Sequence, residues 1–301
     1  MTASALLTAP GPAAPPVRLG RTRLYARRFA RNRGALVGVV LLAGLVLFAT
    51  FGSVLTRWSW SQSDFLALTR PPTTAHPFGT NQGGNDVLAE CVHGLQRSLV
   101  IAACVSVLTM VIAAVVGAGA AYLGGRIERV SLAVIHFLLV VPSFLILALV
   151  SNRVAGDWRV LIVVLTVFGW MLNARVIWSV STSLRERDYV RTAEFMGVAR
   201  WRIVLRHIVP HLGALLIVNT TLGIDNTVLS ETALSFLGFG VKPPDVSLGS
   251  LLADGASSIS SAPWLFGYPS LLLVVLTVSV MLIGDGLRDA LDPTSSSGGR
   301  G

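Results

Sequence analysis

Lysine is almost absent from this chain of 301 residues, because Lys242 is its only one. The phosphate-binding loop of an ATPase needs a lysine followed by serine or threonine to reach the nucleotide phosphates. Lys242 is followed by Pro243 instead. The sequence therefore contains no such loop, and we expect this chain to be a non-catalytic protein that holds no cofactor of its own.

Cysteine is also scarce, since Cys91 and Cys104 are the only two and lack the spacing of a metal site. Cys104 lies in an apolar run, so we expect no structural disulfide. His207 and His211 are four residues apart, but Pro210 lies between them and no glutamate completes a zinc motif. The sequence therefore predicts no metal site.

Charged residues are scarce as well. Only 13% of the residues are charged and 53% are hydrophobic, with a mean hydropathy of +0.69, whereas soluble domains average about 25% charged residues. Several apolar runs exceed the roughly 18 residues that cross a bilayer as a helix. Because lipid cannot satisfy backbone hydrogen bonds, these runs predict an all-α integral membrane protein.

Six apolar runs predict six transmembrane helices, at 35–56, 98–123, 131–150, 159–180, 211–234 and 266–288. The run from Gly34 to Thr56 is too long for the core of a signal peptide and should remain as an anchor. The predicted organisation is a basic tail (1–33), the first helix (34–56), an external segment (57–97), a core with five more helices (98–290) and a C-terminal tail (291–301).

The arginines predict the orientation in the membrane, because basic residues concentrate on the cytoplasmic side. With the N-terminus inside, seventeen arginines fall in inner segments and only six basic residues in outer ones. Both termini should therefore be cytoplasmic. The net charge of +9 is interpreted as this topology signal rather than as a nucleic-acid surface.

The inner loop 181–210 is too long to be a simple turn and carries apolar residues at helical spacing on both sides of Gly197. We expect two short amphipathic helices that meet at Gly197 and end at Pro210. Such a unit can lie on anionic lipid or dock into a groove on a cytoplasmic partner. Periodicity alone leaves both interpretations open.

The same loop resembles the signature loop of bacterial ABC importer permeases. Thr192-Ala193, Gly197 and Pro210 recur at the spacing of that signature, and 188–191 and 206–210 resemble its dipeptide and oligopeptide importer version. The general signature has glutamate where this chain has Arg191, so the contacts of that position do not carry over. The resemblance implies a loop that couples to ATPase subunits through Tyr189, Arg191, Ala193, Glu194, Gly197, Arg202, His207 and Pro210.

A second resemblance to the same permeases lies in the external segment 76–88, which is similar to their HPxGTDxxGRD stretch. The matching residues are His76, Gly79, Thr80, Gly84 and Asp86. Asn81 and Asn85 replace the usual Asp and Arg, so a charge pair should be missing. Asp86 is predicted to cap a helix that begins at Val87, although an oxygen-rich turn can also hold a hard cation.

Segment 231–240, followed by Pro243 and Pro244, resembles the E-x-x-LSFLGLG stretch of peptide permeases, with Leu248 where tryptophan is typical. Segment 284–293 resembles their C-terminal ending. Together the matches run from about residue 20 to residue 293. They imply the type I ABC importer permease (MetI-like) fold in the bacterial inner membrane, as one multi-pass subunit.

Polar residues inside the membrane are costly and should face protein or water. At about 1.5 Å per residue, Arg175 and Asp225 differ in depth by roughly 14 Å, which argues against a direct pair. A translocation path and gate is predicted from seven residues, although they can equally bond neighbouring helices or subunits. These residues are Asn219, Asp225, Asn226, Glu231, Ser235, Phe236 and Gly238.

The resemblance implies an importer of dipeptides or oligopeptides. Its expected partners are a second homologous permease, two ATPase subunits or one fused ATPase that hold ATP and Mg²⁺, an external substrate-binding protein and the bilayer, with no nucleic acid. Nickel complexes or haem are alternative substrates. An ion-gradient transporter or a non-transporting scaffold is the rival class, but no internal repeat of the kind such transporters carry is evident.

Overall fold

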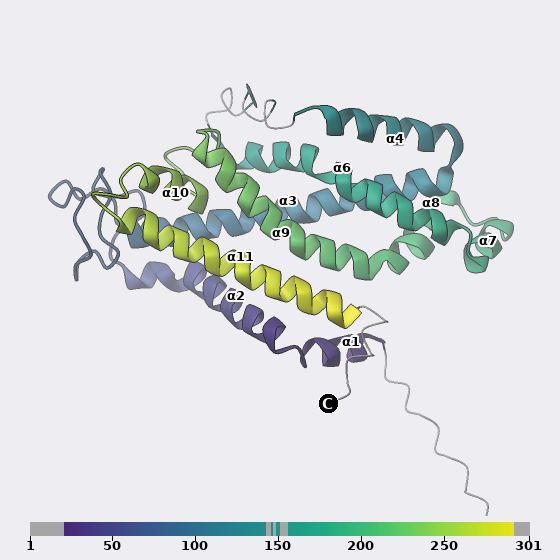
Figure 1. The fold of residues 1–301 in the computed structure, drawn as a ribbon, viewed down its shortest axis with the longest axis horizontal. Helices are drawn as coiled ribbons and strands as arrows, with labels where there is room; N and C mark the ends of the chain where they lie inside the picture. Colours follow the sequence, from purple (N-terminus) through teal and green to yellow (C-terminus); the bar gives the residue numbers. More distant parts are fainter. Residues whose placement is uncertain (1–20, 143–145, 147–148, 151–155, 292–301) are drawn as a thin grey trace, which may run out of the picture.

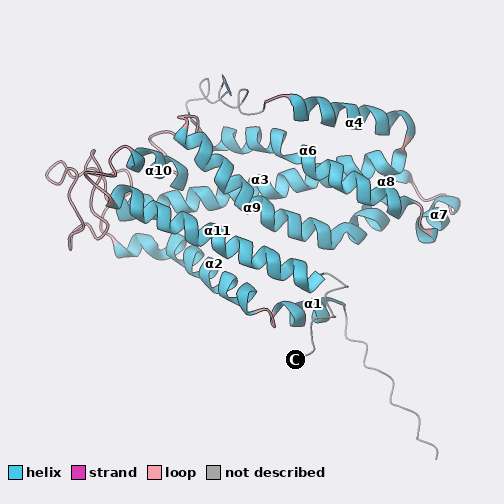
Figure 2. Ribbon diagram, viewed as in Figure 1, coloured by secondary structure: helices cyan, strands magenta, loops and turns pink. Residues whose placement is uncertain are grey.

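The computed structural model describes residues 21–142, 146, 149–150 and 156–291 (Figure 1). These residues form helices joined by loops, with isolated bridges but no β-strand among them (Figure 2). The all-α prediction is therefore confirmed. Both predicted tails fall largely outside the described residues, as does part of the predicted span 131–150.

The helices run in the order expected from the apolar pattern. Their bounds are α1 (Arg21–Phe29), α2 (Arg33–Phe51), α3 (Val87–Leu123), α4 (Gly125–Val140), α6 (Trp158–Arg185), α7 (Asp188–Phe195), α8 (Arg200–Ile203), α9 (Gly213–Phe236), α10 (Leu248–Ala256) and α11 (Trp264–Leu291). Short 3₁₀ turns occupy Gly52–Leu55 and Val209–Leu212, and one π turn occupies Val204–Ile208.

Five helical runs are long and apolar enough to cross a membrane, namely Arg33–Leu55, Val87–Leu123, Trp158–Arg185, Arg200–Phe236 and Trp264–Leu291. They match five of the six predicted spans. Within the sixth, α4 ends at Val140, and residues 143–145 and 147–148 lie outside the described residues. The count of six spans and the cytoplasmic termini therefore stay predictions.

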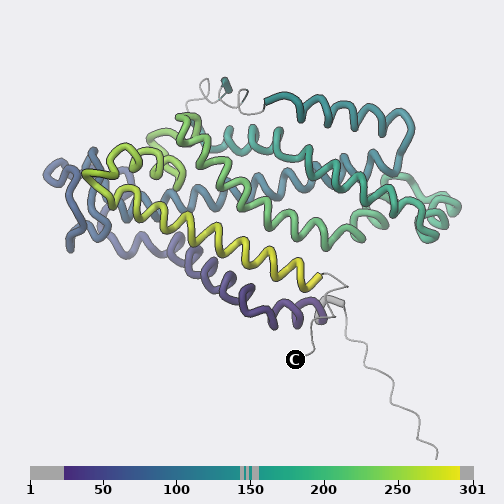
Figure 3. Tube along the Cα trace, in the orientation of Figure 1, coloured from purple at the N-terminus to yellow at the C-terminus, as the bar shows by residue number. Residues whose placement is uncertain are grey.

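The long helices form an elongated bundle in which α3 packs against α6 and α9, and α2 packs against α11 (Figure 3). The segment between α2 and α3 lies with α10 at one end, called here the α10 end (Figure 1). The opposite end, called the α7 end, holds α1 and α7. This agrees with the predicted assignment of 57–97 and 181–210 to opposite sides of the membrane.

Small residues bring the helix backbones close together. A side chain added at Gly38 would meet the Ser279 carbonyl oxygen of α11 at 2.7 Å, and one at Gly117 would meet the Ala174 carbonyl oxygen of α6 at 2.5 Å. Glycine and alanine at these positions permit the close approach that drives helix association in lipid. Such close approach is therefore seen at two interfaces, between α2 and α11 and between α3 and α6.

The prediction that Pro210 ends the helical unit is wrong. The chain stays helical from Arg200 through Pro210 to Phe236. Proline lacks a backbone N–H and clashes with the preceding turn of an α-helix. The π turn and the 3₁₀ turn change the hydrogen-bond register around Pro210, so that the chain accommodates it without breaking.

Replacing Gly38 with valine should destabilise the bundle, because the new side chain has no space against α11. Overpacking of this kind costs about 1–3 kcal/mol. Gly44→Val on the same helix is the matched control, since nothing lies within 4 Å of an added side chain there. Thermal unfolding in detergent should show a lower midpoint for Gly38→Val alone. Equal midpoints would contradict the α2–α11 contact.

Candidate functional site

The elbow at the α7 end, defined as residues 186–212, turns at Gly197. The Gly197 N–H donates to the Glu194 carbonyl oxygen (3.0 Å), and the Val198 N–H donates to the Ala193 carbonyl oxygen (3.1 Å). This pair of bonds is a Schellman motif that ends α7. Gly197 has a φ of 75°, in the left-handed region that favours glycine. The predicted turn at Gly197 is confirmed, although the helix that follows it opens the long run Arg200–Phe236 instead of standing as a second short helix.

The elbow is built into the core of the bundle. Val190 and Ala193 of α7 and Ile203 of α8 are buried. They belong to the same cluster as Met110 of α3 and Ile177 of α6. Because a close-packed interior transmits displacement, movement of α7 must shift its contacts with the bundle.

The outer surface of the elbow exposes large apolar side chains on both sides of Gly197. Phe195 is 89% exposed and Met196 is 74% exposed, with Trp201 also largely exposed. Trp201 additionally lies beneath the guanidinium of Arg202, at 5.2 Å from the ring centroid. Such a patch of exposed apolar residues is typical of a surface that another body covers.

Some of the other predicted coupling residues are exposed, and others connect α7 to the segment before α9. Arg191 and Glu194 are exposed on α7, and Pro210 is exposed on its 3₁₀ turn. The Tyr189 ring stacks on His211 at 4.7 Å between centroids. The ring nitrogen Nδ1 of His211 lies 2.6 Å from the carbonyl oxygen of His207. The elbow thus joins α7 to the start of α9.

A groove of about 510 Å³ runs between α3, α6 and α9. Its lining is uncharged, and its polar members include Thr109, Asn173, Asn226 and Ser230. The side-chain amide of Asn226 donates to the Leu222 carbonyl oxygen at 3.1 Å. Its carbonyl oxygen has no hydrogen-bond partner among the described residues. The groove therefore offers amides and hydroxyls within apolar walls.

Sequence patterns identified Asn226 but missed Asn173. Asn173 lies on α6, which was not interpreted as a path-lining helix, whereas Asn226 shares its helix with other polar residues. Only the packing of α6 against α3 and α9 brings Asn173 to the groove. The sequence does contain one signal for Asn173, namely a single asparagine within an apolar run. Such an amide needs a polar partner inside the membrane.

Glu231 and Ser235 lie in a buried joint instead of lining the groove. Glu231 is 1% exposed, and its Oε1 accepts hydrogen bonds from the hydroxyls of Ser235 (2.8 Å) and Ser247 (2.6 Å). Ser247 caps α10, so this joint ties α9 to α10. Phe236 is exposed at the end of α9, and Gly238 follows it with a φ of 80°.

Asn219 and Asp225 are half-buried on α9 and do not line the groove. Arg175 is exposed on α6. Within the described part of the chain Arg175 and Asp225 form no ion pair, as their predicted difference in depth requires. An exposed cation within a spanning helix needs water or a further protein chain around it.

At the α10 end, Asp86 caps α3 as predicted. Its Oδ2 accepts from the Ala89 N–H (3.0 Å) and from the Thr56 hydroxyl (2.9 Å). Its Oδ1 lies 3.0 Å from His76 Nδ1. Both Asp86 and His76 are buried, and Trp58 stacks on the His76 ring. Asp86 is thus a structural anchor for the external segment.

The turn 79–85 follows from glycine geometry and asparagine bonding. Gly79 and Gly84 have φ values of 80° and 77°. Asn81 accepts from the backbone N–H groups of Gly83 (2.8 Å) and Asn85 (3.0 Å). Its amide donates to Glu90 Oε1 at 2.9 Å. As predicted, this turn has no charge pair at positions 81 and 85. Hydrogen bonds of Asn81 hold the turn instead.

Thr80 is fully buried and links the same turn to more distant segments. Its hydroxyl accepts from the Arg70 N–H at 2.9 Å and donates to the Ala67 carbonyl oxygen. The Trp264 indole donates to the Thr80 carbonyl oxygen at 3.2 Å. The predicted external motif residues are thus brought together as one folded cap over the ends of α3 and α11.

Asp245 latches the loop before α10 onto α3. It lies 2.7 Å from His93 Nε2 and 2.9 Å from Arg97 Nε. Burial alone would raise the pKa of Asp245, but the hydrogen bonds from His93 and Arg97 outweigh burial and hold the pKa below its usual value. Asp254 differs, because burial raises its pKa with no charged partner to oppose it.

Asp245→Asn should therefore lower the thermal midpoint at neutral pH, by roughly 2–4 °C. A lowered folded-state pKa stabilises the fold above the ordinary value of 3.8, and this contribution is lost as pH falls through the folded-state value. The difference between wild type and variant should shrink with acidification. Asp254→Asn is the matched control, and it should not lower the midpoint. The latch is refuted if both variants melt alike.

Residues 110–296 match the family described as "Binding-protein-dependent transport system inner membrane component". Residues 21–72 match "N-terminal TM domain of oligopeptide transport permease C". The first match covers more than half of the chain, including the elbow and all of the groove lining except Val105 and Thr109.

Curated relatives align over most of their own length. The oligopeptide transport system permease protein OppC of Mycobacterium tuberculosis is 44% identical over 283 residues, covering 93% of this chain and 97% of the relative. The protein of the same name from Bacillus subtilis is 30% identical, covering 88% and 87%. A putative peptide transport system permease of Brucella abortus is 34% identical, covering 90% and 91%.

Proposed function

Because the chain belongs to the family of binding-protein-dependent transport inner-membrane components, we propose that it is the subunit through which an ATP-driven importer moves peptides across the bacterial inner membrane. The single observation that carries the proposal is the elbow, whose exposed apolar surface and buried core contacts occur together on both sides of Gly197. The names of the relatives support a peptide as the substrate.

The elbow is suited to receive force from a separate ATPase. Phe195, Met196 and Trp201 offer a surface for docking, while Val190 and Ile203 connect that surface to α3 and α6. Docking on an ATPase accounts for both features. A helix that only lies on lipid accounts for the exposed surface but needs no rigid connection to the core.

The groove is suited to pass a peptide. A peptide carries many amide groups, and Asn173, Asn226 and Ser230 supply matching donors and acceptors in an uncharged lining. Uncharged partners bind weakly enough to release a moving substrate, the balance that a conducting pore requires. Asp225 and Glu231 lie outside this lining, and Glu231 ties α9 to α10 through Ser247.

The proposed assembly contains a second, homologous permease that closes the groove. Two ATPase subunits, or one fused ATPase, bind the elbows and hold ATP and Mg²⁺, so this chain needs no nucleotide site. An external binding protein delivers the substrate. ATP-driven closure of the ATPases then shifts the bundle between inward-open and outward-open states.

Nickel complexes and haem are substrates that the same architecture can carry. An ion-gradient transporter is the rival class. Uptake into vesicles that hold ATP but no proton gradient separates the two classes, since only an ATP-driven importer keeps its rate there. Loss of uptake in such vesicles would refute the proposal.

Gly197→Val should uncouple the importer while leaving the fold inserted. A β-branched residue at a φ of 75° is strained, although no atom lies within 4 Å of the added side chain. We expect peptide uptake by the reconstituted complex to fall roughly tenfold while ATP hydrolysis continues.

Gly197→Asn is the matched variant, because asparagine tolerates this conformation far better than valine. It should keep most of the uptake. Full uptake by the valine variant would count against the coupling role of the elbow.

Asn226→Leu should slow uptake about three- to tenfold, since it removes one amide from the groove. ATP hydrolysis and complex assembly should be unchanged. Asn219→Leu on the same helix is the comparison, because Asn219 lies outside the lining. If the two variants behave alike, the groove is not the path. The measurement is the initial rate of labelled dipeptide uptake into proteoliposomes.

A further inference from the structure

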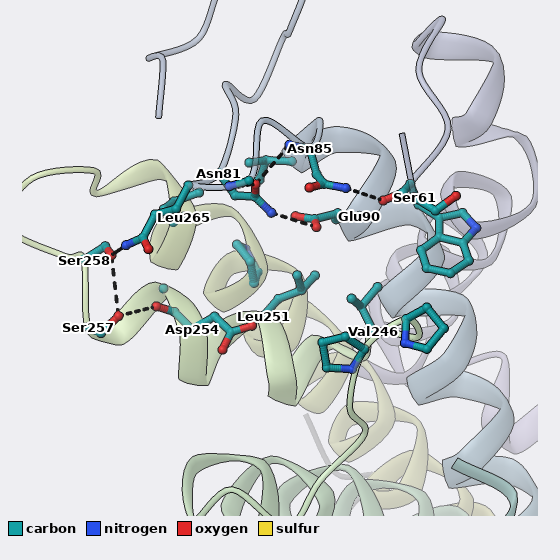
Figure 4. Close-up of a pocket in the computed structure, with 18 residues that line it drawn as sticks. Ser61, Asn81, Asn85, Glu90, Val246, Leu251, Asp254, Ser257, Ser258 and Leu265 are labelled. Carbon is teal, nitrogen blue, oxygen red and sulfur yellow. Dashed lines mark hydrogen bonds between the residues drawn. The ribbon is translucent and has the colours of Figure 1, made fainter. Parts of the chain in front are cut away.

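A second cavity lies at the α10 end and takes no part in the proposed coupling or path. This outer pocket has a volume of about 440 Å³ and is enclosed by α3, α10, α11, the turn 81–85 and the loop 243–246 (Figure 4). Its volume falls within the range of about 300–1,000 Å³ that small-molecule sites occupy. It is separate from the groove between α3, α6 and α9.

Two carboxyl groups face this pocket without a basic partner. Glu90, in the first turn of α3, is only 6% exposed, and Asp254 of α10 lies nearer the surface. Figure 4 shows Glu90 beside Asn81 along one side of the hollow and Asp254 beside Leu251 along the other. No Arg, Lys or His lines the pocket, and neither carboxyl belongs to an ion pair of the described residues.

Glu90 is held in place but not fully satisfied. Its Oε1 accepts one hydrogen bond from the Asn81 amide at 2.9 Å. Its second oxygen receives no hydrogen bond from the described residues. A buried carboxylate is costly unless a positive charge or several donors accompany it. The pocket therefore gains most from a ligand that brings a cation with N–H donors.

The remaining walls select among cations. The described residues contain no group of three or more metal-ligating side chains, which argues against a metal ion. Asn85 and Ser257 offer hydrogen bonds, while Val246 and Leu265 offer apolar surface. This mixture suits an organic ligand that has an ammonium group, amides and a small apolar side chain.

We propose that the outer pocket is a binding site for the amino end of a short peptide, whose ammonium group lies between Glu90 and Asp254. The inference rests on the proposed peptide substrate and extends it, because it gives this chain a peptide site outside the groove. Charge-assisted hydrogen bonds from ammonium to carboxylate supply the recognition.

The test uses the purified full-length chain in lipid nanodiscs and isothermal titration calorimetry. The ligand is alanyl-alanine amide, whose only charge is its ammonium group, and the matched ligand is N-acetyl-alanyl-alanine amide. The uncharged ligand should bind about tenfold more weakly or not at all. Equal binding of the two ligands would overturn the proposal.

Glu90→Gln should weaken binding of the charged ligand about tenfold, while glutamine can still accept from Asn81. Asp254→Lys places a cation at the exposed side of the pocket and should abolish binding. Glu186→Gln, an exposed site at the α7 end, is the matched control and should bind like wild type. Thermal unfolding verifies that each variant is folded.

Unchanged binding in folded Glu90→Gln and Asp254→Lys would refute the site. Absence of peptide binding, combined with cross-linking of the pocket to a basic residue of an external protein, would also refute it and identify a protein-docking surface instead. Peptide uptake by the assembled importer is measured separately. A complex that imports peptide while the chain fails this binding test would leave the proposed function intact.

Discussion

The packing of α7 and α8 into the buried cluster formed by α3 and α6 is the contact on which the account of this protein depends. The side chains of Val190, Ala193 and Ile203 are buried in the bundle and do not belong to an exposed loop. The Schellman turn at Gly197 fixes the angle between the two helices. A displacement of the exposed side of the elbow is therefore transmitted through these packed side chains to the spanning helices.

The same bundle separates three environments along its length. The α7 end exposes aromatic and basic side chains, the middle holds an uncharged groove, and the α10 end is closed by a cap in which His76, Asp86 and Thr80 are buried. α9 connects them, since it continues from the elbow, lines the groove and ends at the Glu231 joint with α10. Motion at one end can therefore alter the groove and the cap together.

Much of this arrangement could be predicted from the sequence, because hydrophobic runs, glycine and capping residues act locally. The five long runs, the turn at Gly197 and the Asp86 cap follow from such signals. The predicted membership of the permease family is confirmed as well. The prediction that the helix ends at Pro210 was wrong, because the local preferences of proline do not indicate the π turn that accommodates it. Asn173, Glu90 and the bonds of Glu231 depend on which helices pack together, which no single segment encodes.

Photo-cross-linking from the elbow in native membranes tests the central claim most directly. A photoreactive amino acid is placed at Phe195, the most exposed large apolar residue of the elbow, and for comparison at Leu66 in the external segment. The account predicts that Phe195 captures an ATP-hydrolysing subunit from the cytoplasmic side and that Leu66 does not. Capture of that subunit from Leu66, or of an extracellular protein from Phe195, would contradict it.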